Sequence, residues 1–153
     1  MSERTIPERD MGSDPRTLAS SRVAIPALTD RNTPFWTGGA NGELLIAHCQ
    51  TCGWWLHPPL PVCRRCRGRD IRPEAVSGLG TVWSFTVNRY QWSPGLTPPY
   101  VIAEVELAEQ NGLRLLTSIV DTDEVSIGLQ VRVQFEAAGD AWVPVFRPVS
   151  GQP

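Results

Sequence analysis

The four cysteines of the chain lie in one short window, as Cys49-Gln-Thr-Cys52 and, after ten intervening residues, Cys63-Arg-Arg-Cys66. A C-x-x-C pair turns both sulfurs to one side, and two such pairs that close on each other supply the four thiolates of a tetrahedral Zn²⁺ site. Gly53 and Gly68 follow the two pairs closely, where we expect positive φ at the turn of each knuckle. The spacing predicts a zinc site with four cysteine ligands: Cys49, Cys52, Cys63 and Cys66.

This zinc site is expected to be structural. Four protein ligands close the coordination sphere, whereas a catalytic zinc keeps one position open for water. His48 and His57 lie near the cysteines, but the complete cysteine set favours surface or packing positions for both. No catalytic residue is therefore predicted in this part of the chain.

Three other chemistries fit cysteines at this spacing less well. Two disulfides in a secreted domain would follow a signal peptide, and the first thirty residues contain no apolar stretch of that kind. A thioredoxin-like redox site uses one C-x-x-C pair beside a βαβ pattern. An iron site with the same four sulfurs remains open. We expect a cytoplasmic protein that binds zinc.

The composition limits the size and the partners of the fold. A chain of 153 residues makes about one domain, or two very small ones that share a core. The net charge of −2 creates no basic field for nucleic acid or membrane, and no run of 18 apolar residues predicts a membrane span. Fourteen prolines and thirteen glycines indicate short strands and many turns.

The first part of the chain reads as an arm, a short helix and a ribbon. Residues 1–32 are polar and are expected to form a flexible arm. Thr33 as N-cap and Pro34 in the first turn predict a helix that glycines at 38–42 end within about two turns. Strands are expected at 44–47 and 54–59, before and after the first knuckle. The adjacent tryptophans at 54 and 55 suit either a stacking platform or, more simply, shielding of the metal.

From residue 76 onward the pattern becomes all-β, with alternation of period two. Five strands are expected, at 81–87, 101–107, 113–120, 131–135 and 141–146. Pro144 places the last of them at an edge or a bulge. Five short antiparallel strands suit an OB-fold barrel, with an SH3-like barrel as the alternative.

The predicted fold class is mainly β, with an N-terminal short helix and a rubredoxin-like zinc ribbon followed by a five-stranded OB-fold barrel. The corresponding segments are the flexible arm 1–32, the helix and zinc ribbon 33–75, the OB-fold barrel 76–149 and a tail 150–153.

The order of these motifs resembles the zinc-ribbon/OB-fold family of acyl-CoA-associated proteins, long known as a domain of unknown function. The resemblance covers about residues 33–149 and rests on Phe35-Trp36, Gly42-Glu-Leu44, Cys49 to Gly53, Pro58-Pro59, Cys63, Cys66, Ser77-Gly78, Gly80, Val82, Pro99-Tyr100, Ala103, Val105, Ile127-Gly128, Val131, Val133, Phe146 and Pro148.

The resemblance implies an accessory, non-catalytic subunit. Members of this family associate with thiolase-superfamily enzymes, lipid-transfer-type aldolases or acyl-CoA hydratases, and help to line the route of the acyl-CoA. A retro-aldolase acting on steroid side-chain or related lipid acyl-CoA is one such partner, in a hetero-oligomer. The residues agree with a non-catalytic role, because every cysteine belongs to the metal set and no nucleophile motif is present.

Two further groups are candidate contacts for acyl-CoA or for a partner. Arginines cluster on and after the second knuckle, where Arg64, Arg65 and Arg67 suit coenzyme A phosphates or an acidic partner. A solvated surface beside an anionic zinc–thiolate unit explains them equally well. The loop at 88–99 carries Tyr90 and Trp92, which suit an acyl channel or a docking contact, or simply a loop folded over the barrel mouth.

A single-stranded nucleic-acid-binding protein is the alternative function. Zinc ribbons and OB-folds both occur in such proteins, and arginines with exposed aromatics serve a single strand. The net charge of −2, the pI near 5.7 and the acidic Glu104 and Glu106 argue against it.

Overall fold

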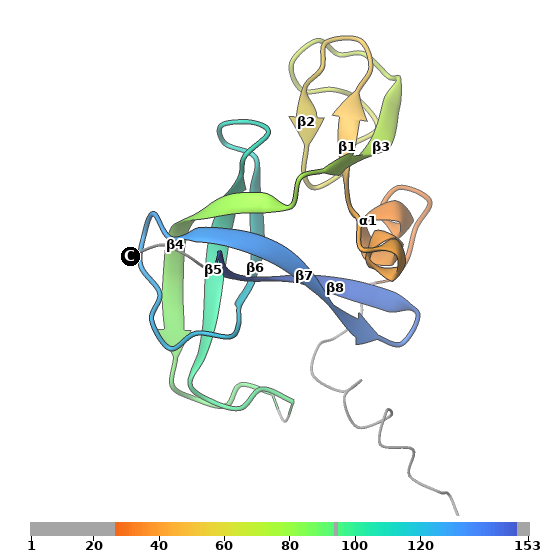
Figure 1. Cartoon of the computed structure of the whole chain (residues 1–153). Helices are drawn as coiled ribbons and strands as arrows, with labels where there is room; N and C mark the ends of the chain where they lie inside the picture. Colours follow the sequence, from red (N-terminus) through yellow and green to blue (C-terminus); the bar gives the residue numbers. More distant parts are fainter. Residues whose placement is uncertain (1–26, 94, 150–153) are drawn as a thin grey trace, which may run out of the picture.

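The protein is described by a computed structural model for residues 27–93 and 95–149, and most of its regular elements are strands (Figure 1). The elements are α1 (Thr33–Thr37), the 3-10 helix η2 (Gly38–Asn41), β1 (Leu44–Cys49), β2 (Trp55–Leu56), β3 (Ile71–Val76), β4 (Leu79–Asn88), β5 (Tyr100–Leu107), β6 (Arg114–Ile119), β7 (Gln130–Ala138) and β8 (Ala141–Pro148). They form a three-stranded sheet, β2-β1-β3, and a closed barrel, β4-β5-β6-β8-β7. Most of the expected arm and the whole expected tail lie outside the described residues.

The predicted helix is present, but its N-terminus differs from the prediction. Asn32 occupies the N-cap position that was assigned to Thr33, and its side chain caps no helical N–H. The Thr33 hydroxyl instead donates backwards to the carbonyl of Thr29 at 2.7 Å, so it is not available as a cap. The α-helix ends at its C-cap Gly38, and the chain continues as η2 until Gly42 turns it at φ 73°, so the glycines at 38–42 end the helical segment as predicted.

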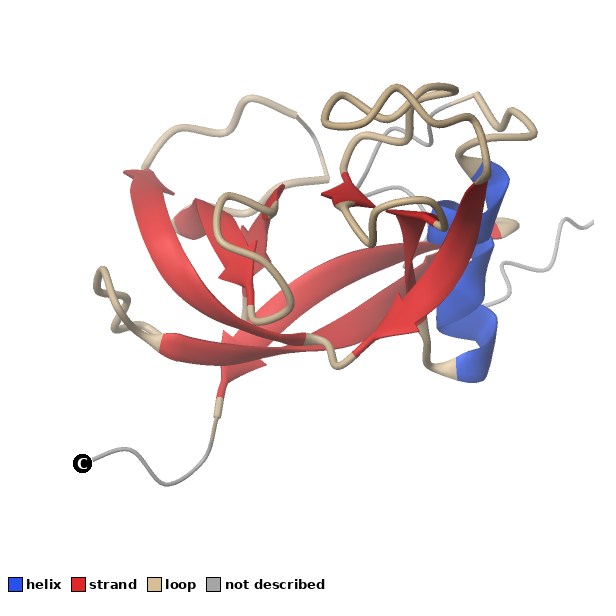
Figure 2. Cartoon of the chain, turned by 90° about the horizontal axis from the view of Figure 1, so that it is seen from above, coloured by secondary structure: helices blue, strands red, loops and turns tan. Residues whose placement is uncertain are grey.

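The helical segment packs on the barrel through a close backbone approach. An added Cβ on Gly39 would lie 2.4 Å from Trp142 Cβ and 2.6 Å from Phe135 Cδ1, so only glycine fits here. Figure 2 shows the helices at one side of the strands. Phe35 of α1 is buried and joins one core with the barrel and with Leu44 and Ile46 of β1. The ribbon and the barrel therefore share this hydrophobic core.

The ribbon sheet contains one strand that was not predicted. β1 pairs with β2 at two positions, and it pairs with β3 along its whole length, from Leu44 opposite Val76 to Cys49 opposite Ile71. Pro73 lies inside β3 between charged residues, which hides the strand from a search for apolar alternation. Pairing with β1, which is remote in sequence, imposes the extended conformation.

The barrel has the strand pairing of an OB-fold. β4 pairs with both β5 and β7, and the third and fifth barrel strands, β6 and β8, meet in parallel at Ile119 and Phe146. This closed five-stranded arrangement confirms the predicted OB-fold over the SH3-like alternative. β8 has a continuous strand partner only in β7, which agrees with the edge position expected for Pro144. The Thr117 hydroxyl of β6 bridges the open side by donating to the Pro144 carbonyl at 2.8 Å.

A bulge in β4 divides its alternating residues between two faces. The register shifts between Val82 and Ser84, so Trp83 points outward while Val82 is buried. Beyond the bulge Phe85 pairs with Ala103, which is buried in the barrel. Phe85 thus lies on the inner face, and a uniform alternation from Trp83 to Phe85 does not hold.

The turn between β5 and β6 holds the ribbon on the barrel. Gln110 accepts a hydrogen bond from the backbone N–H of Trp55 at 2.9 Å and donates one to the carbonyl of the same residue at 3.2 Å. Glu109 accepts from the backbone N–H of Ser77, between β3 and β4, at 2.7 Å. These contacts, together with the shared core, fix the ribbon beside the end of the β5–β6 hairpin.

Replacing Gly39 with alanine is expected to destabilise the protein by about 1–3 kcal/mol, because the new methyl group meets Trp142 Cβ, which is fixed to the backbone. The free energy of unfolding is measured by denaturant titration with zinc present. Gly42→Ala is the comparison, since no atom lies within 4 Å of its added Cβ and only the positive φ opposes the change. Equal stability of Gly39→Ala and wild type would contradict the packing described here.

Candidate metal centre

The two knuckles have the same backbone hydrogen bonds. The N–H of Cys49 donates to the carbonyl of Trp54, and that of Cys63 donates to the carbonyl of Gly68, both at 2.9 Å. The carbonyls of the same two cysteines accept from Gly53 at 2.8 Å and Arg67 at 2.9 Å. Each C-x-x-C pair is therefore a preformed turn, and the two turns face each other.

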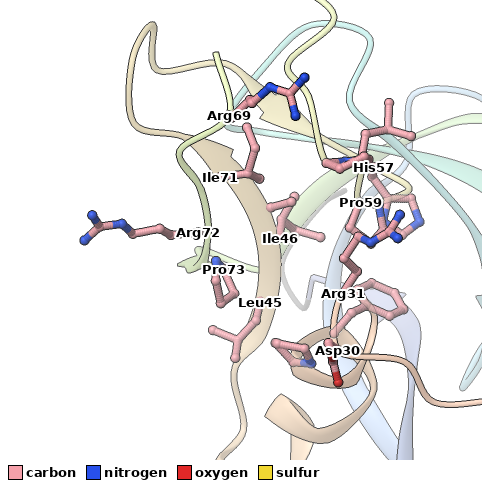
Figure 3. Close-up of a pocket in the computed structure, with 15 residues that line it drawn as sticks. Asp30, Arg31, Leu45, Ile46, His57, Pro59, Arg69, Ile71, Arg72 and Pro73 are labelled. Atoms are coloured by element: carbon pink, nitrogen blue, oxygen red, sulfur yellow. The ribbon is translucent and has the colours of Figure 1, made fainter. Parts of the chain in front are cut away.

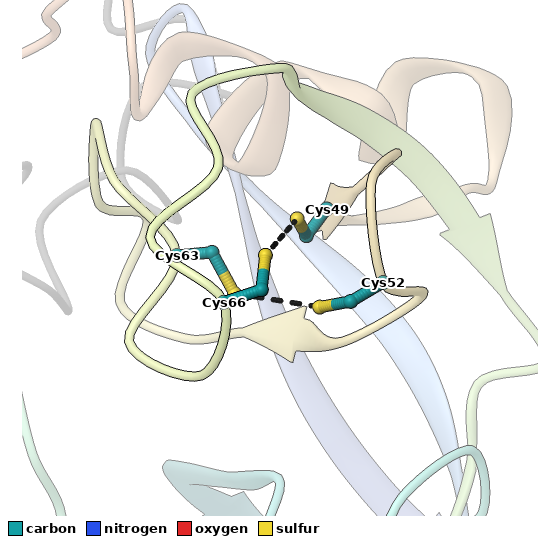
Figure 4. Close-up of side chains that lie close together, drawn as sticks. All are labelled: Cys49, Cys52, Cys63 and Cys66. Atoms are coloured by element: carbon teal, nitrogen blue, oxygen red, sulfur yellow. Dashed lines mark hydrogen bonds between the residues drawn. The ribbon is translucent and has the colours of Figure 1, made fainter.

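The four sulfurs gather at one point between the knuckles (Figure 4). All four Sγ atoms lie within 4.8 Å of one another, with 3.6 Å between Cys49 and Cys66 and 3.7 Å between Cys52 and Cys63. Tetrahedral zinc with Zn–S bonds of about 2.3 Å separates its sulfurs by roughly 3.8 Å. The geometry thus fits a zinc ion held by four thiolates, which leaves no position for water or substrate.

Backbone N–H groups point at the sulfurs in the same way in both knuckles. Burial by itself would raise the pKa of Cys49. The backbone N–H groups of Cys52 and Thr51 oppose this effect, and the net result is a lowered pKa. Donors from Cys66 and Arg65, opposed by burial, lower the pKa of Cys63 to about 7. These donors favour the thiolate form of Cys49 and Cys63, which is the form that binds zinc, whereas burial and the neighbouring sulfurs raise the pKa of Cys52 to about 12.

The second knuckle corrects the expectation for Gly68. Arg67, with φ 63°, occupies the left-handed position that Gly53, with φ 69°, occupies in the first knuckle. Gly68 does not have a positive φ, and its N–H donates to Cys66 Sγ at 3.3 Å. Glycine is favoured at 68 for space, because a Cβ would lie 2.7 Å from Thr51 Oγ1.

Neither histidine belongs to the sulfur cluster. His48 Nδ1 lies 3.0 Å from Glu74 Oε2, and its ring stacks on Trp55 with centroids 4.1 Å apart. His57 packs beside Phe35 at 4.9 Å, and burial lowers its pKa to about 4. Both side chains therefore have the packing positions expected of them.

The structure separates the arginine cluster into two clefts. Arg64 and Arg65 line a cleft of about 310 Å³ between the second knuckle and the β5–β6 turn. Trp54 also lines it, and Arg65 Cζ lies 4.9 Å from the centre of the Trp54 ring. Trp54 also packs against the cluster that contains Cys49 and Cys63, so shielding and arginine stacking are combined in one side chain.

The second cleft, of about 340 Å³, lies between α1 and the ribbon sheet (Figure 3). Ile46, Ile71 and prolines provide apolar walls, and Arg31, Arg69 and Arg72 contribute the cations. Arg72 is engaged by Asp70 at 2.9 Å and points away from the other labelled side chains. Arg67, which was grouped with Arg64 and Arg65 in the sequence, lines neither cleft.

The two loop aromatics lie at the other end of the barrel. Tyr90 and Trp92 meet edge to face with centroids 5.0 Å apart, and both are largely exposed. They follow the end of β4 that is remote from the ribbon (Figure 1). The loop does not bury these rings over the barrel mouth, and it does not bring them to the knuckle arginines.

Three residues important for the surface or for the contact between ribbon and barrel were not identified as such from sequence. Trp83 was treated as one residue of an alternating strand, and Arg114 was not selected, yet the Arg114 guanidinium lies 3.7 Å from the centre of the Trp83 ring. Gln110 appeared only as a turn residue. Only the strand register reveals these partners, because they come from different hairpins or units.

None of the helices in the described part of the chain is long and apolar enough to cross a membrane.

Two family models match adjacent parts of the chain. Residues 36–72 match the ChsH2 rubredoxin-like zinc ribbon domain, and residues 73–136 match the ChsH2 C-terminal OB-fold domain. The solved structure "Ltp2-ChsH2(DUF35) aldolase" superposes with a TM-score of 0.73 and 35% identity, over 81% of this chain and 98% of that one. A DUF35-family protein of unknown function from Sulfolobus solfataricus, with TM-score 0.57 and 18% identity, shares the fold over 78% of this chain and 86% of that one.

Three curated relatives are named as hydratase subunits or as a scaffold protein. The "probable enoyl-CoA hydratase alpha subunit" of Thermomonospora curvata is 37% identical over 83% of this chain and 40% of its own length. The "3-oxo-4,17-pregnadiene-20-carboxyl-CoA hydratase alpha subunit" of Mycobacterium tuberculosis is 34% identical over 90% of this chain and 45% of its own. A "DUF35 domain-containing scaffold protein" of Methanocaldococcus jannaschii is 33% identical, over 60% of this chain and 67% of its own length. The chain thus spans less than half of the two hydratase subunits.

Cys63→Ser is expected to abolish stoichiometric zinc and soluble folding, since a structural zinc site contributes on the order of 10 kcal/mol or more of apparent folding free energy. Zinc content of purified protein is measured by elemental analysis, together with the soluble yield. Arg64→Ser is the matched control, because it changes an exposed residue of the same knuckle. A soluble, zinc-free Cys63→Ser protein with a native unfolding transition would disprove the structural role.

His57 is expected to make the protein less stable as pH falls from about 6.5 to 4. The folded protein keeps His57 neutral, with its pKa lowered from 6.5 to about 4 by burial, while the unfolded chain takes up the proton. The contribution of neutral His57 to the free energy of unfolding is fully present above pH 6.5, and at most about 3 kcal/mol of it is lost by pH 4. His57→Phe should lose this component. Because acid also protonates the thiolates, the free energies of the two proteins are compared at each pH and the same free zinc concentration.

Proposed function

The chain belongs to the ChsH2-type zinc-ribbon/OB-fold (DUF35) family, and we propose that it is a non-catalytic accessory subunit of an acyl-CoA-processing enzyme. The observation that carries this proposal is the 98% coverage of the ChsH2(DUF35) chain in a solved aldolase at 35% identity. The family zinc ribbon and barrel are thus both represented here. The hydratase names belong to proteins of which this chain covers less than half, so hydration is not assigned to it.

The metal centre supports a structural contribution from this chain. A tetrathiolate zinc has no open position at which to activate water or polarise a carbonyl. All four cysteines of the sequence lie in that centre, so none of these residues is left to act as a thiol nucleophile for condensation or its reversal. The described surface, in contrast, offers clefts and exposed aromatic side chains that suit binding.

For the partner we propose a thiolase-superfamily enzyme, such as a lipid-transfer-type aldolase that acts on steroid side-chain or related lipid acyl-CoA. The names of two similar proteins support this choice, one of an aldolase and one of a hydratase subunit for a pregnadiene-carboxyl-CoA. The cleft of Arg64 and Arg65 would then meet the phosphates of the acyl-CoA, because guanidinium groups bind phosphate in bidentate fashion. Tyr90 and Trp92, at the remote end of the barrel, would contact the partner instead.

The test is co-expression of the full chain with a thiolase-superfamily enzyme of the same organism, followed by size-exclusion chromatography and an acyl-CoA cleavage assay. We expect co-elution and an enzyme that is active only, or mainly, in the complex. Arg64→Ala with Arg65→Ala should leave co-elution unchanged and raise the KM for the acyl-CoA substrate about tenfold or more, since phosphate contacts are lost.

Failure to co-elute, together with enzyme activity that is indifferent to this chain, would overturn the accessory role. An unchanged KM of the double arginine variant would remove only the phosphate assignment. The nucleic-acid alternative is tested with labelled single-stranded DNA over a salt series, where tight and steeply salt-dependent binding would favour it. Glu104 and Glu106 on the outer side of the barrel oppose such binding electrostatically.

A further inference from the structure

The outer face of β4, β5 and β6 carries an exposed apolar patch that the metal centre and the clefts do not use. Cross-strand register aligns Ser84, Glu104 and Leu116 in one row across the three strands. The next row contains Glu106 and Arg114. Residues directly opposite each other share a face, so these side chains all point away from the barrel core, as Trp83 does from the bulge beside Ser84.

Trp83 and Arg114 form a preorganised pair on this face. The guanidinium of Arg114 lies 3.7 Å from the centre of the Trp83 ring, and its Nε is 3.2 Å from Glu106 Oε2. The Trp83 ring, from β4, thus reaches across β5 to a side chain of β6. Both long side chains are held in place before any partner arrives, which lowers the entropy lost on binding.

The patch exposes large apolar side chains to solvent. Trp83 is 50% exposed and Leu116, two residues after Arg114 on the same face, is 77% exposed. The described helices cover a different side, because α1 and η2 pack on β7, β8 and β1. Tryptophan and arginine are also the residues that most often dominate binding energy at protein interfaces.

The charges of the face indicate what kind of surface it fits. Arg114 neutralises Glu106, whereas among the described residues Glu104 has no cationic partner and accepts a hydrogen bond from the Ser84 hydroxyl at 3.1 Å. A negative charge therefore remains beside the apolar patch. A protein surface with an apolar anchor and a nearby arginine or lysine complements it, while a polyanion such as a nucleic acid does not.

We propose that the Trp83–Arg114–Leu116 face, with Glu104 at its side, is the surface on which the acyl-CoA enzyme subunit docks. This inference rests on the proposed function, which supplies the partner. It adds the location of the interface, on the outer face of barrel strands β4, β5 and β6, and the chemistry of the partner surface, which is apolar with a basic residue opposite Glu104.

The experiment immobilises the full chain on a sensor surface and measures its dissociation constant for the thiolase-superfamily enzyme. Leu116→Glu and Trp83→Ala should each weaken the complex at least tenfold, because they remove the anchors of the interface. Ile127→Glu is the matched control: Ile127 is also an exposed aliphatic residue, 73% accessible, but it lies on a different segment. Glu104→Gln should make the association rate less dependent on salt.

Several outcomes are decisive. If wild type binds but Leu116→Glu binds as tightly as Ile127→Glu, the docking face is wrong and the accessory role stands. If wild type does not bind the enzyme, the proposed function fails and this inference fails with it. Self-association of wild type that Leu116→Glu abolishes would assign the face to a second copy of the chain. Binding of an oligo-dT probe that Leu116→Glu abolishes would assign it to nucleic acid, and either result overturns the proposal. Circular dichroism confirms that the variants fold.

Discussion

The closed four-sulfur centre is the interaction on which the ribbon depends. The buried cluster of the ribbon itself contains Cys49, Leu56 and Cys63, so two of its three members are metal ligands and little apolar surface remains to drive folding. β2 is two residues long and could not persist alone. A zinc ion that ties both knuckles together replaces the missing core, and the backbone N–H groups that point at the sulfurs compensate the charge of the thiolates.

The metal centre determines the positions of the elements around it. The second knuckle places Arg64 and Arg65 beside Trp54, and β1 carries the chain from the first knuckle into the shared core through Ile46. Gln110 then joins the ribbon to the barrel with two hydrogen bonds to one residue, Trp55. The ribbon is thus fixed on the barrel, and the walls of the cleft of Arg64 and Arg65 come from both units. Such a body suits positioning of another protein or of a ligand better than chemistry of its own.

The zinc site has no free coordination position, and no cysteine nucleophile lines the described clefts. Both features are consistent with the family. Relatives carry names of aldolase and hydratase subunits and of a scaffold protein, and the shared part is the ribbon with the barrel. The proposed interface on β4–β6 and the arginine cleft are formed by different side chains and adjoin at the β5–β6 turn, where Leu113 lines the cleft and Arg114 belongs to the interface. An enzyme subunit can therefore be held by one surface while an acyl-CoA meets the other, and the two contributions can be separated by mutation.

The sequence by itself determined the metal site and most of the strands. Knuckle spacing and strand alternation are local properties, so they predicted the cysteine cluster, the five barrel strands and the OB-fold. Tertiary structure alone decided what depends on register and reach. β3 exists because it pairs with β1, Arg67 takes the turn position expected of Gly68, and the bulge turns Trp83 outward to Arg114. Long-range pairing also separated the arginines into two clefts and sent Tyr90 and Trp92 to the far end of the barrel, because neighbours in sequence point to different faces once the chain turns.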